Sequence, residues 1–361
     1  GFFANTTGSA FNMNLPAGSA GAIVSVADYA GTWQTNNLTV VPNGTDKIGG
    51  INANAILSTE GQSVTFIFVD STQGWVNVQD STSNERGGAF IVATGGNATL
   101  TNGNFKTHVF TGPGTFCVSA GVGVDAVAEY IVVAGGGGAE QYGGAGAGGF
   151  RSTIFACVPS PTTSPNANPT KLSIAPGAFP ITVGSGGPGG SPPTTVGGPG
   201  SNSIFSTITS AGGGGGRSDS NGVGDNGGSG GGSRGSAPPG PESANPYAGT
   251  PAPGPAAAGP GGIGDFIADT VLGPTAPSYG TPGPASSVRY FAGGGGSGTN
   301  NNTTTYPGGS GGGGNGGGTS PSPAPTTNGA TNTGGGAGGN GSPGNPRSGG
   351  SGIVMIRYKF Q

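Results

Sequence analysis

The sequence predicts an all-β protein in which a β domain is followed by a long glycine-rich domain anchored on β-strands. Three observations support this prediction. In the first part of the chain, short β-branched and aromatic runs alternate with turn residues at roughly ten-residue spacing. Of 361 residues, 85 are glycine and 31 are proline, which are rare inside helices and central strands. Helix-period patterns are missing throughout, so no α-helical domain is expected.

Residues 1–92 form the predicted N-terminal β domain. The runs "AGAIVSVADYAG", "NNLTVVPNG", "SVTFIFVDST" and "GWVNVQDS" are separated by Gly, Asn, Asp and Pro. This punctuation is typical of antiparallel sheets. A β-sandwich and a barrel-like fold both fit the pattern.

Residues 93–361 form the predicted glycine-rich domain. The C-terminal run "GIVMIRYKFQ" has apolar residues on both faces and must join a sheet. Because it follows the long glycine region, strand pairing would bring the two ends of that region together. The glycine region therefore belongs inside a folded unit. The expected strands lie at 104–134, 171–183, 203–210, 287–292 and 353–361.

An apolar run leads directly into glycine several times, as in "YIVVAGGGG", "FPITVGSGGPGG", "SIFSTITSAGGGGG" and "SVRYFAGGGGSG". Glycines also recur three residues apart, for example at Gly143, Gly146 and Gly149. Three residues per turn is the period of the polyproline-II helix, which glycine allows to pack at backbone contact distance. We expect packed polyglycine-II helices between the strands, with flexible coil as the alternative.

Charge and cysteine content exclude several classes of protein. Only 7% of residues are charged and the net charge is −3, which leaves no basic surface for nucleic acid or for a membrane. No apolar run approaches the ~20 residues of a membrane span. The chain begins at Gly1 with no visible signal peptide, so we expect a processed protein or a distal part of a longer one. Cys117 and Cys157 are either a disulfide pair or two unrelated thiols.

Motifs for catalysis or cofactors are not convincing. After the strand at 130–133, a dinucleotide-binding G-x-G-x-x-G would need glycine at position 140, which is Glu140. No G-K-[ST] phosphate loop occurs. His108 is the only histidine, and we expect it to face solvent from a strand. We predict no enzyme activity, no cofactor and no metal site.

Isolated aromatic residues in the glycine and loop region are the candidate binding residues. Loops on a rigid scaffold commonly carry recognition, and tyrosine among small residues is typical of binding surfaces. Packing onto the glycine helices is the alternative for each. The candidates are Tyr142, Phe150, Tyr247, Phe266, Tyr279 and Tyr306.

"DYAGTWQTNNLTVVPNGTDKIGG", "EGQSVTFIFVD" and "GWVNVQDST" resemble a β segment of bacteriophage tail fibres, notably marine ones. "EYIVVAGGGGAEQYGGAGAGGFR", "PITVGSGGPGG", "ITSAGGGGG" and "GGSGIVMIRYKF" resemble their glycine-rich C-terminal domain. The resemblance implies a homotrimeric or tip-mounted adhesin in the tail fibre of an extracellular virion. The long Pro/Ser/Asn stretches 191–202, 217–260 and 299–333 would be loops that set host specificity.

The expected function is therefore non-catalytic recognition of a bacterial surface polysaccharide or outer-membrane protein, with other tail proteins as further partners. Neither nucleic-acid binding nor membrane insertion is expected. A purely structural virion or filament component is the main alternative, and an ice-binding protein is a second.

Overall fold

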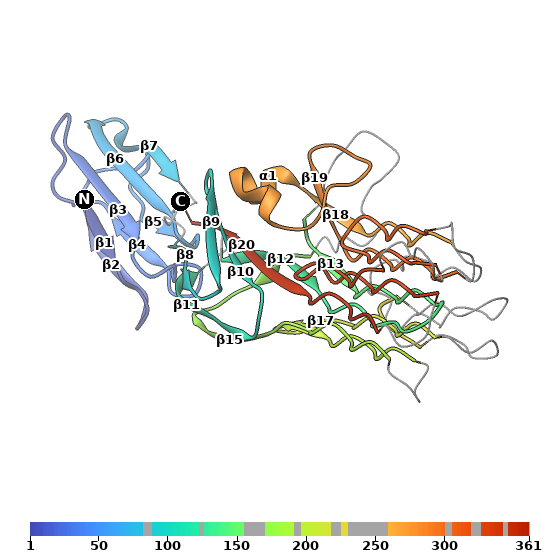
Figure 1. Cartoon of the computed structure of the whole chain (residues 1–361). Coiled ribbons are helices and arrows are strands. Elements are labelled where there is room, and N and C mark those ends of the chain that lie inside the picture. The colour runs from blue at the N-terminus through green and yellow to red at the C-terminus, as the bar shows by residue number, and fades with distance from the viewer. Residues whose placement is uncertain are drawn as a thin grey trace. The chain divides into compact units, whose positions relative to one another are not determined.

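The computed structural model describes residues 1–81, 89–122, 126–154, 170–190, 196–217, 225–229, 259–299, 305–318, 326–341 and 346–360. The chain divides into two compact units, Gly1–Gly87 and Gly88–Gln361 (Figure 1). The division lies before the position 92 expected from the sequence, because β8 (Ala89–Thr94) pairs with β11 (Gly114–Val122) of the second unit. The fold is nearly all-β, as predicted: the described residues form several sheets and one short α-helix.

The N-terminal unit is a sandwich of two sheets around one core. The strand order is β1-β3-β6-β7 in one sheet and β2-β4-β5 in the other. Alternating residues of β3 and β6 face inward, and Trp33 and Trp75 are fully buried between the sheets. The strands are β1 (Phe2–Ala4), β2 (Phe11–Asn14), β3 (Ile23–Asp28), β4 (Leu38–Val41), β5 (Ala55–Leu57), β6 (Ser63–Asp70) and β7 (Gly74–Ser81).

A second sandwich forms the base of the C-terminal unit. One sheet has the order β13-β12-β20-β10-β9 with β14 beside β12, and the other has the order β17-β16-β15-β11-β8. Aromatic residues of both sheets, including Phe116, Phe205 and Tyr358, share the core between them. The further strands are β9 (Ala98–Asn102), β10 (Phe105–Phe110), β12 (Val127–Val133), β13 (Phe150–Ser152), β14 (Leu172–Ser173), β15 (Gly177–Thr182), β16 (Ser203–Phe205), β17 (Ile208–Ser210) and β20 (Ile353–Lys359).

The C-terminal strand β20 lies in the middle of its sheet, antiparallel to both β10 and β12. Val354 and Ile356 point into the core of the sandwich, whereas Ile353 and Met355 point into a second core on the opposite face. That second face is covered by the hairpin β18 (Asp265–Ala268) and β19 (Val288–Phe291) and by the helices α1 (Asp269–Leu272) and η1 (Gly273–Ser278) (Figure 1). A helix of four residues is too short to leave a periodic pattern in the sequence.

His108 is buried, so the prediction that it faces solvent was wrong. Its side chain is 2% exposed and stacks on Tyr358. Nδ1 lies 2.7 Å from the carbonyl oxygen of Gly95, and Nε2 lies 3.0 Å from the hydroxyl of Tyr358. Burial lowers the pKa of His108, and burial raises the pKa of Tyr358 to about 12. The two polar side chains satisfy each other inside an aromatic core, an arrangement that strand alternation alone does not reveal.

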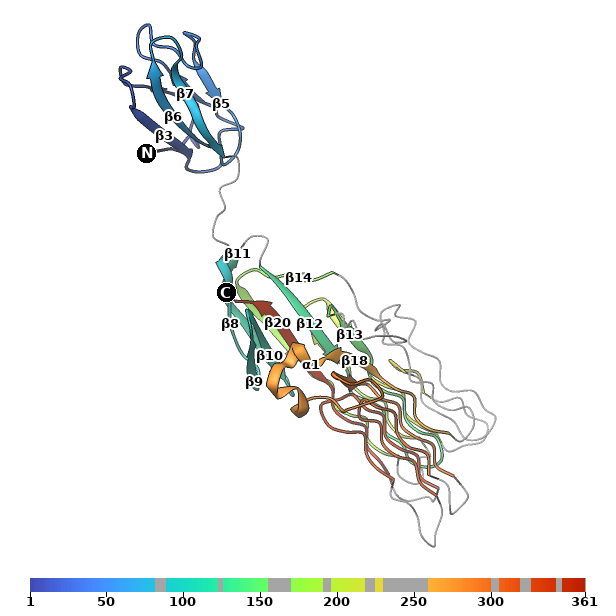
Figure 2. The same ribbon diagram turned by 90° about the horizontal axis from the view of Figure 1, so that it is seen from above.

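The glycine segments continue from the ends of these strands and pack side by side (Figure 2). We call this bundle the polyglycine lattice. Its described segments are 134–139, 142–149, 184–190, 196–202, 211–217, 225–229, 259–264, 292–299, 305–318, 326–341 and 346–352.

Backbone hydrogen bonds of segment 134–139 repeat every three residues. The amides of Ala134 and Gly137 donate to segment 142–149, those of Gly135 and Gly138 to 196–202, and those of Gly136 and Ala139 to 346–352. The carbonyls of the same segment accept from 184–190, 211–217 and 326–341 as well. Successive residues therefore point about 120° apart around the axis. This is the geometry of a helix with three residues per turn that is surrounded by other segments along the same axis.

A second segment, 292–299, shows the same period. From Gly293 onward its amides donate in turn to 305–318, 259–264 and 142–149, and the cycle then repeats. These amides thus find carbonyls on other segments, which satisfies the backbone of 292–299 without intrahelical bonds. The predicted packing of polyglycine-II helices is present in the structure.

Glycine is required at positions 135–138 because a Cβ at each of them would clash with the backbone of a neighbouring segment. A Cβ on Gly136 would lie 2.1 Å from the carbonyl oxygen of Gly335, and a Cβ on Gly137 would lie 2.1 Å from that of Gly214. Alanine occurs where a methyl group has room: Ala139, Ala145 and Ala337 cluster in one interior gap. The requirement is therefore steric and specific to each position.

Segments at the outside of the lattice carry other residues on their solvent side. Ser185 and Pro188, three residues apart, are exposed while their glycine neighbours pack inward. Proline fits here because its fixed φ matches the polyproline-II helix. The stretches 191–202 and 299–333 were predicted to be loops, yet 196–202, 305–318 and 326–333 form lattice hydrogen bonds. The prediction was wrong for these parts because Pro, Ser and Asn occupy outward positions without breaking the helix.

Candidate functional site

The candidate site is the end of the lattice farthest from the sheets, which we call the tip. Segment 134–139 leaves β12, turns at Glu140–Tyr142, and returns as 142–149 to β13. The other segments also extend between the sheets and the tip, and Figure 2 shows them lying along one common axis. Some leave the sheets, and others, such as 346–352 before β20, return to them. Isolated bridges at the tip join Val196 to Arg217, Gln141 to Asn340, Ala139 to Arg347 and Tyr306 to Gly316.

Five polar stretches begin and end at residues of the tip. Their sequences are "SPPTT" (191–195), "SDSNGVG" (218–224), "NNNTT" (300–304), "TSPSPAP" (319–325) and "SPGN" (342–345). They contain hydroxyl and amide groups, prolines and a single charged residue, Asp219. Their flanking residues, which the structure describes, belong to lattice segments at the tip.

Polar side chains of the tip form short local contacts. Arg217 pairs with Asp225 at 3.2 Å, and both side chains are about 30% exposed (30% and 27%). The Nε of Arg347 donates to the hydroxyl of Thr326 over 2.7 Å. Glu140 is 2% exposed, and its Oε2 has no hydrogen-bond partner among the described residues. These contacts fix segment ends that would otherwise fray.

Two of the six aromatic candidates lie at the tip. Tyr142 is partly exposed and occupies a left-handed backbone conformation (φ 56°) in the turn after Glu140. Tyr306 is also partly exposed, and its carbonyl accepts the amide of Gly316. Both residues flank segment 292–299, since Gly298 donates to Tyr142 and the Cα of Gly296 faces Tyr306.

Three other candidates lie near the sheets. Phe150 is 1% exposed and packs against Phe291, and Phe266 is 3% exposed and packs against Tyr290. Tyr279 is half-buried beside the second core. Phe150 and Phe266 therefore pack into apolar cores beside the sheets, with strand residues as partners. Tyr247 lies outside the described residues.

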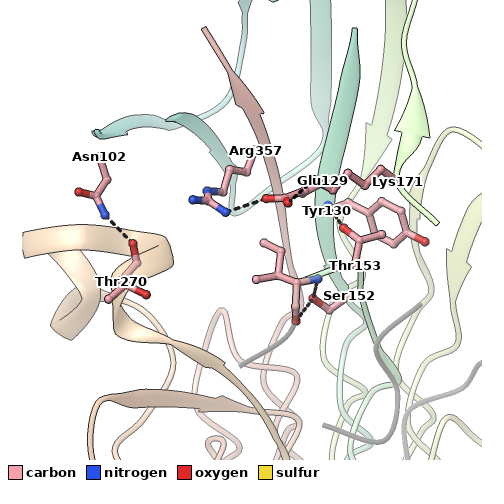
Figure 3. Close-up of polar contacts among 9 residues, drawn as sticks. Asn102, Glu129, Tyr130, Ser152, Thr153, Lys171, Thr270 and Arg357 are labelled. Atoms are coloured by element: carbon pink, nitrogen blue, oxygen red, sulfur yellow. Dashed lines mark hydrogen bonds and ion pairs between the residues drawn. The ribbon is translucent and has the colours of Figure 1, made fainter. Parts of the chain in front are cut away.

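An ion-pair group stiffens the base from which the lattice extends (Figure 3). The carboxylate of Glu129 in β12 forms two ion pairs. Its Oε2 lies 2.7 Å from Nη1 of Arg357 in β20, and its Oε1 lies 2.9 Å from Nζ of Lys171. The guanidinium of Arg357 also lies over the ring of Phe105. Nearby, the side-chain amide of Asn102 in β9 donates to the carbonyl of Thr270 in α1 (Figure 3). These contacts tie the strands and the covering helix to one another.

Among the described residues, no group of three or more His, Cys, Asp or Glu side chains is placed to hold a metal ion. In the same part of the chain, no helix is long and apolar enough to cross a membrane. Cys117 is exposed on β11, and Cys157 lies outside the described residues.

A family model described as a glycine-rich domain matches residues 110–359. The chain belongs to this glycine-rich domain family. The glycine-rich domain match begins at the last residue of β10 and ends at the last residue of β20, so it covers the lattice together with strands of both sheets below it. No curated protein matches the sequence.

The contributions of Arg217, Asp225 and Arg347 to the tip of the glycine-rich domain were not predicted. Each of the three is a charged residue that stands directly beside a glycine run in the sequence or one residue away from it. A charged residue at this place is the local signal that could have marked the end of a lattice segment. Their partners lie on other segments, so the pairing follows from the lattice and not from spacing along the chain.

Proposed function

We propose that this protein is a non-catalytic adhesin that recognises a bacterial cell surface through the tip of its polyglycine lattice, as a component of a phage tail fibre. The observation that carries the proposal is that two partly exposed tyrosines and the described flanks of five polar stretches lie at one end of the bundle. Such a bundle holds variable sequences in place while its own structure is insensitive to them.

The chemistry of the tip favours a polysaccharide as the receptor. Ser, Thr and Asn supply neutral hydrogen-bonding groups, and tyrosine supplies a flat apolar face with a hydroxyl. The five stretches carry a single charge. Binding to neutral sugars would depend little on ionic strength, whereas an electrostatic contact would weaken steeply with salt. Affinity per tip would be modest and increased by several copies on one particle.

Fluorescently labelled protein on a panel of marine bacterial isolates tests this proposal. We expect labelling of some isolates, competition by polysaccharide extracted from them, and little change between low and high salt. Replacing 300–304 and 319–325 with Gly-Ser linkers of equal length should reduce labelling at least about tenfold. The same replacement at 155–169, whose flanks lie beside the sheets, is the control and should keep labelling.

A protein that labels no isolate would favour the alternative, a purely structural fibre component. Labelling that survives replacement of all five stretches would place recognition elsewhere and contradict the proposal.

A further inference from the structure

An apolar groove runs along one side of the N-terminal sandwich, apart from the lattice and its tip. It encloses about 630 Å³ and is lined by residues of β1, β2 and β3 and the turn after β2. The lining is almost entirely apolar, and its most exposed members are Phe2, Phe3, Phe11 and Ile23.

Three of these apolar side chains have more than half of their surface exposed to solvent. Phe3 is 77% exposed, Ile23 63% and Phe2 62%. With about 200 Å² for an aromatic side chain, the four most exposed residues present on the order of 400 Å² of apolar surface. A patch of this size on a small domain is typical of an interaction site.

Two free strand edges border the groove. In the described residues, β1 pairs with β3 and β2 pairs with β4, so each forms the edge of its sheet. Natural edge strands are usually protected by charged residues or proline within the strand. Here the first charged residue of the chain is Asp28, and neither β1 nor β2 contains proline. The outward N–H and C=O groups are therefore open to another strand.

We propose that this groove binds the same groove of a second copy of the chain, so that two N-terminal units pair about a twofold axis. A twofold contact uses one patch on both partners and needs that patch to complement itself. An uncharged apolar groove beside a free edge meets this need, because no like charges oppose each other and two β1 edges can pair antiparallel.

The exposed area also fits this occupant. Two copies of the four side chains would bury on the order of 800 Å², and strand pairing with the remaining lining residues would add to it. The total approaches the ~1,200 Å² of the smaller stable protein interfaces. A small apolar ligand would fill the groove and still leave Phe3 and the edge of β1 in water. This inference does not depend on the proposed receptor binding.

Sedimentation velocity of the full chain between about 0.1 and 100 µM tests the pairing. The wild type should shift with concentration from one chain to two, that is, to twice the 34.0 kDa chain mass. Ile23→Lys places a charge in the interface and should weaken pairing at least about tenfold. Phe3→Lys should do the same, and its 77% exposure makes the monomer tolerant of the change.

Ile56→Lys is the matched control. Ile56 is also 63% exposed, but it lies on β5 at the opposite edge of the three-stranded sheet. It should pair as the wild type does. A wild type that stays monomeric, an assembly of three chains, pairing that survives both groove variants, or equal loss in Ile56→Lys would each overturn the proposal.

Discussion

Replacing Gly137 with alanine should destabilise the C-terminal unit strongly, because the new methyl group meets backbone and not a movable side chain. The Cβ would lie 2.1 Å from the carbonyl oxygen of Gly214, and relief of this contact needs a shift of about 1 Å. That shift stretches hydrogen bonds now at 2.9 to 3.0 Å, from Gly137 to Gly146, from Gly146 to Gly214 and from Ala337 to Gly137.

Each buried backbone group left without its partner costs about 1–3 kcal/mol. Partial loss of the three bonds therefore predicts a decrease of about 3–6 kcal/mol in the free energy of unfolding. At roughly 2–4 °C per kcal/mol for a chain of this size class, the melting temperature should fall by about 6–24 °C. Differential scanning calorimetry of the full chain measures the change in the transition of the C-terminal unit.

Gly112→Ala is the control. No atom lies within 4 Å of the position where its Cβ would be, and its φ is not in the left-handed region. Alanine there should be neutral or stabilising by up to about 1 kcal/mol, since it reduces the entropy of the unfolded chain. Equal effects of the two substitutions on the C-terminal transition would refute the steric reasoning.

Two further predictions concern the base of the lattice. Glu129→Gln should destabilise the C-terminal unit by about 2–4 kcal/mol, because Arg357 is only 17% exposed and loses its ionised partner. Lys171→Gln removes a 48% exposed side chain and should cost under about 1 kcal/mol. A larger loss of stability in Lys171→Gln than in Glu129→Gln would contradict the dominant role of the Glu129–Arg357 pair. Because burial lowers the pKa of His108, the unfolded chain takes up a proton near pH 6.5 while the folded chain does not. The melting temperature should therefore decline as pH falls below about 6.5, until the lower folded pKa is passed, and His108→Gln should lack this decline between about pH 6.5 and 5. An unchanged decline in the variant would show that other groups cause it.

Much of the fold was readable from the sequence because its signals are local. The two faces of the C-terminal strand, Val354 and Ile356 on one side and Ile353 and Met355 on the other, match the two cores that enclose β20. The three-residue glycine period likewise indicated the helix type. Both patterns can be read from the sequence because each depends on the spacing of residues within a single strand or helix.

What the sequence did not reveal depends on contacts between distant segments. His108 is polar and lies in an alternating strand, yet Tyr358, far along the chain, lets it be buried. Phe150 looked like an isolated aromatic residue because its neighbour Phe291 lies on another hairpin. Pro199 lies in a stretch predicted to be a loop, but it faces solvent from an outer helix while the amides of its two neighbours donate to other segments. In each case the deciding partner is remote in sequence.

Hydrogen exchange of the glycine amides tests the ordered lattice most directly. Mass spectrometry or NMR of the full chain at neutral pH would follow segment 134–139 and the amides of Gly336, Ala337 and Gly339, all of which donate to other segments. The lattice predicts exchange slowed by at least about a thousandfold relative to a free peptide, with Gly112, in a partly exposed bend, as a fast internal reference. Exchange at free-peptide rates throughout these segments would contradict the lattice, and with it the rigid base on which the proposed recognition depends.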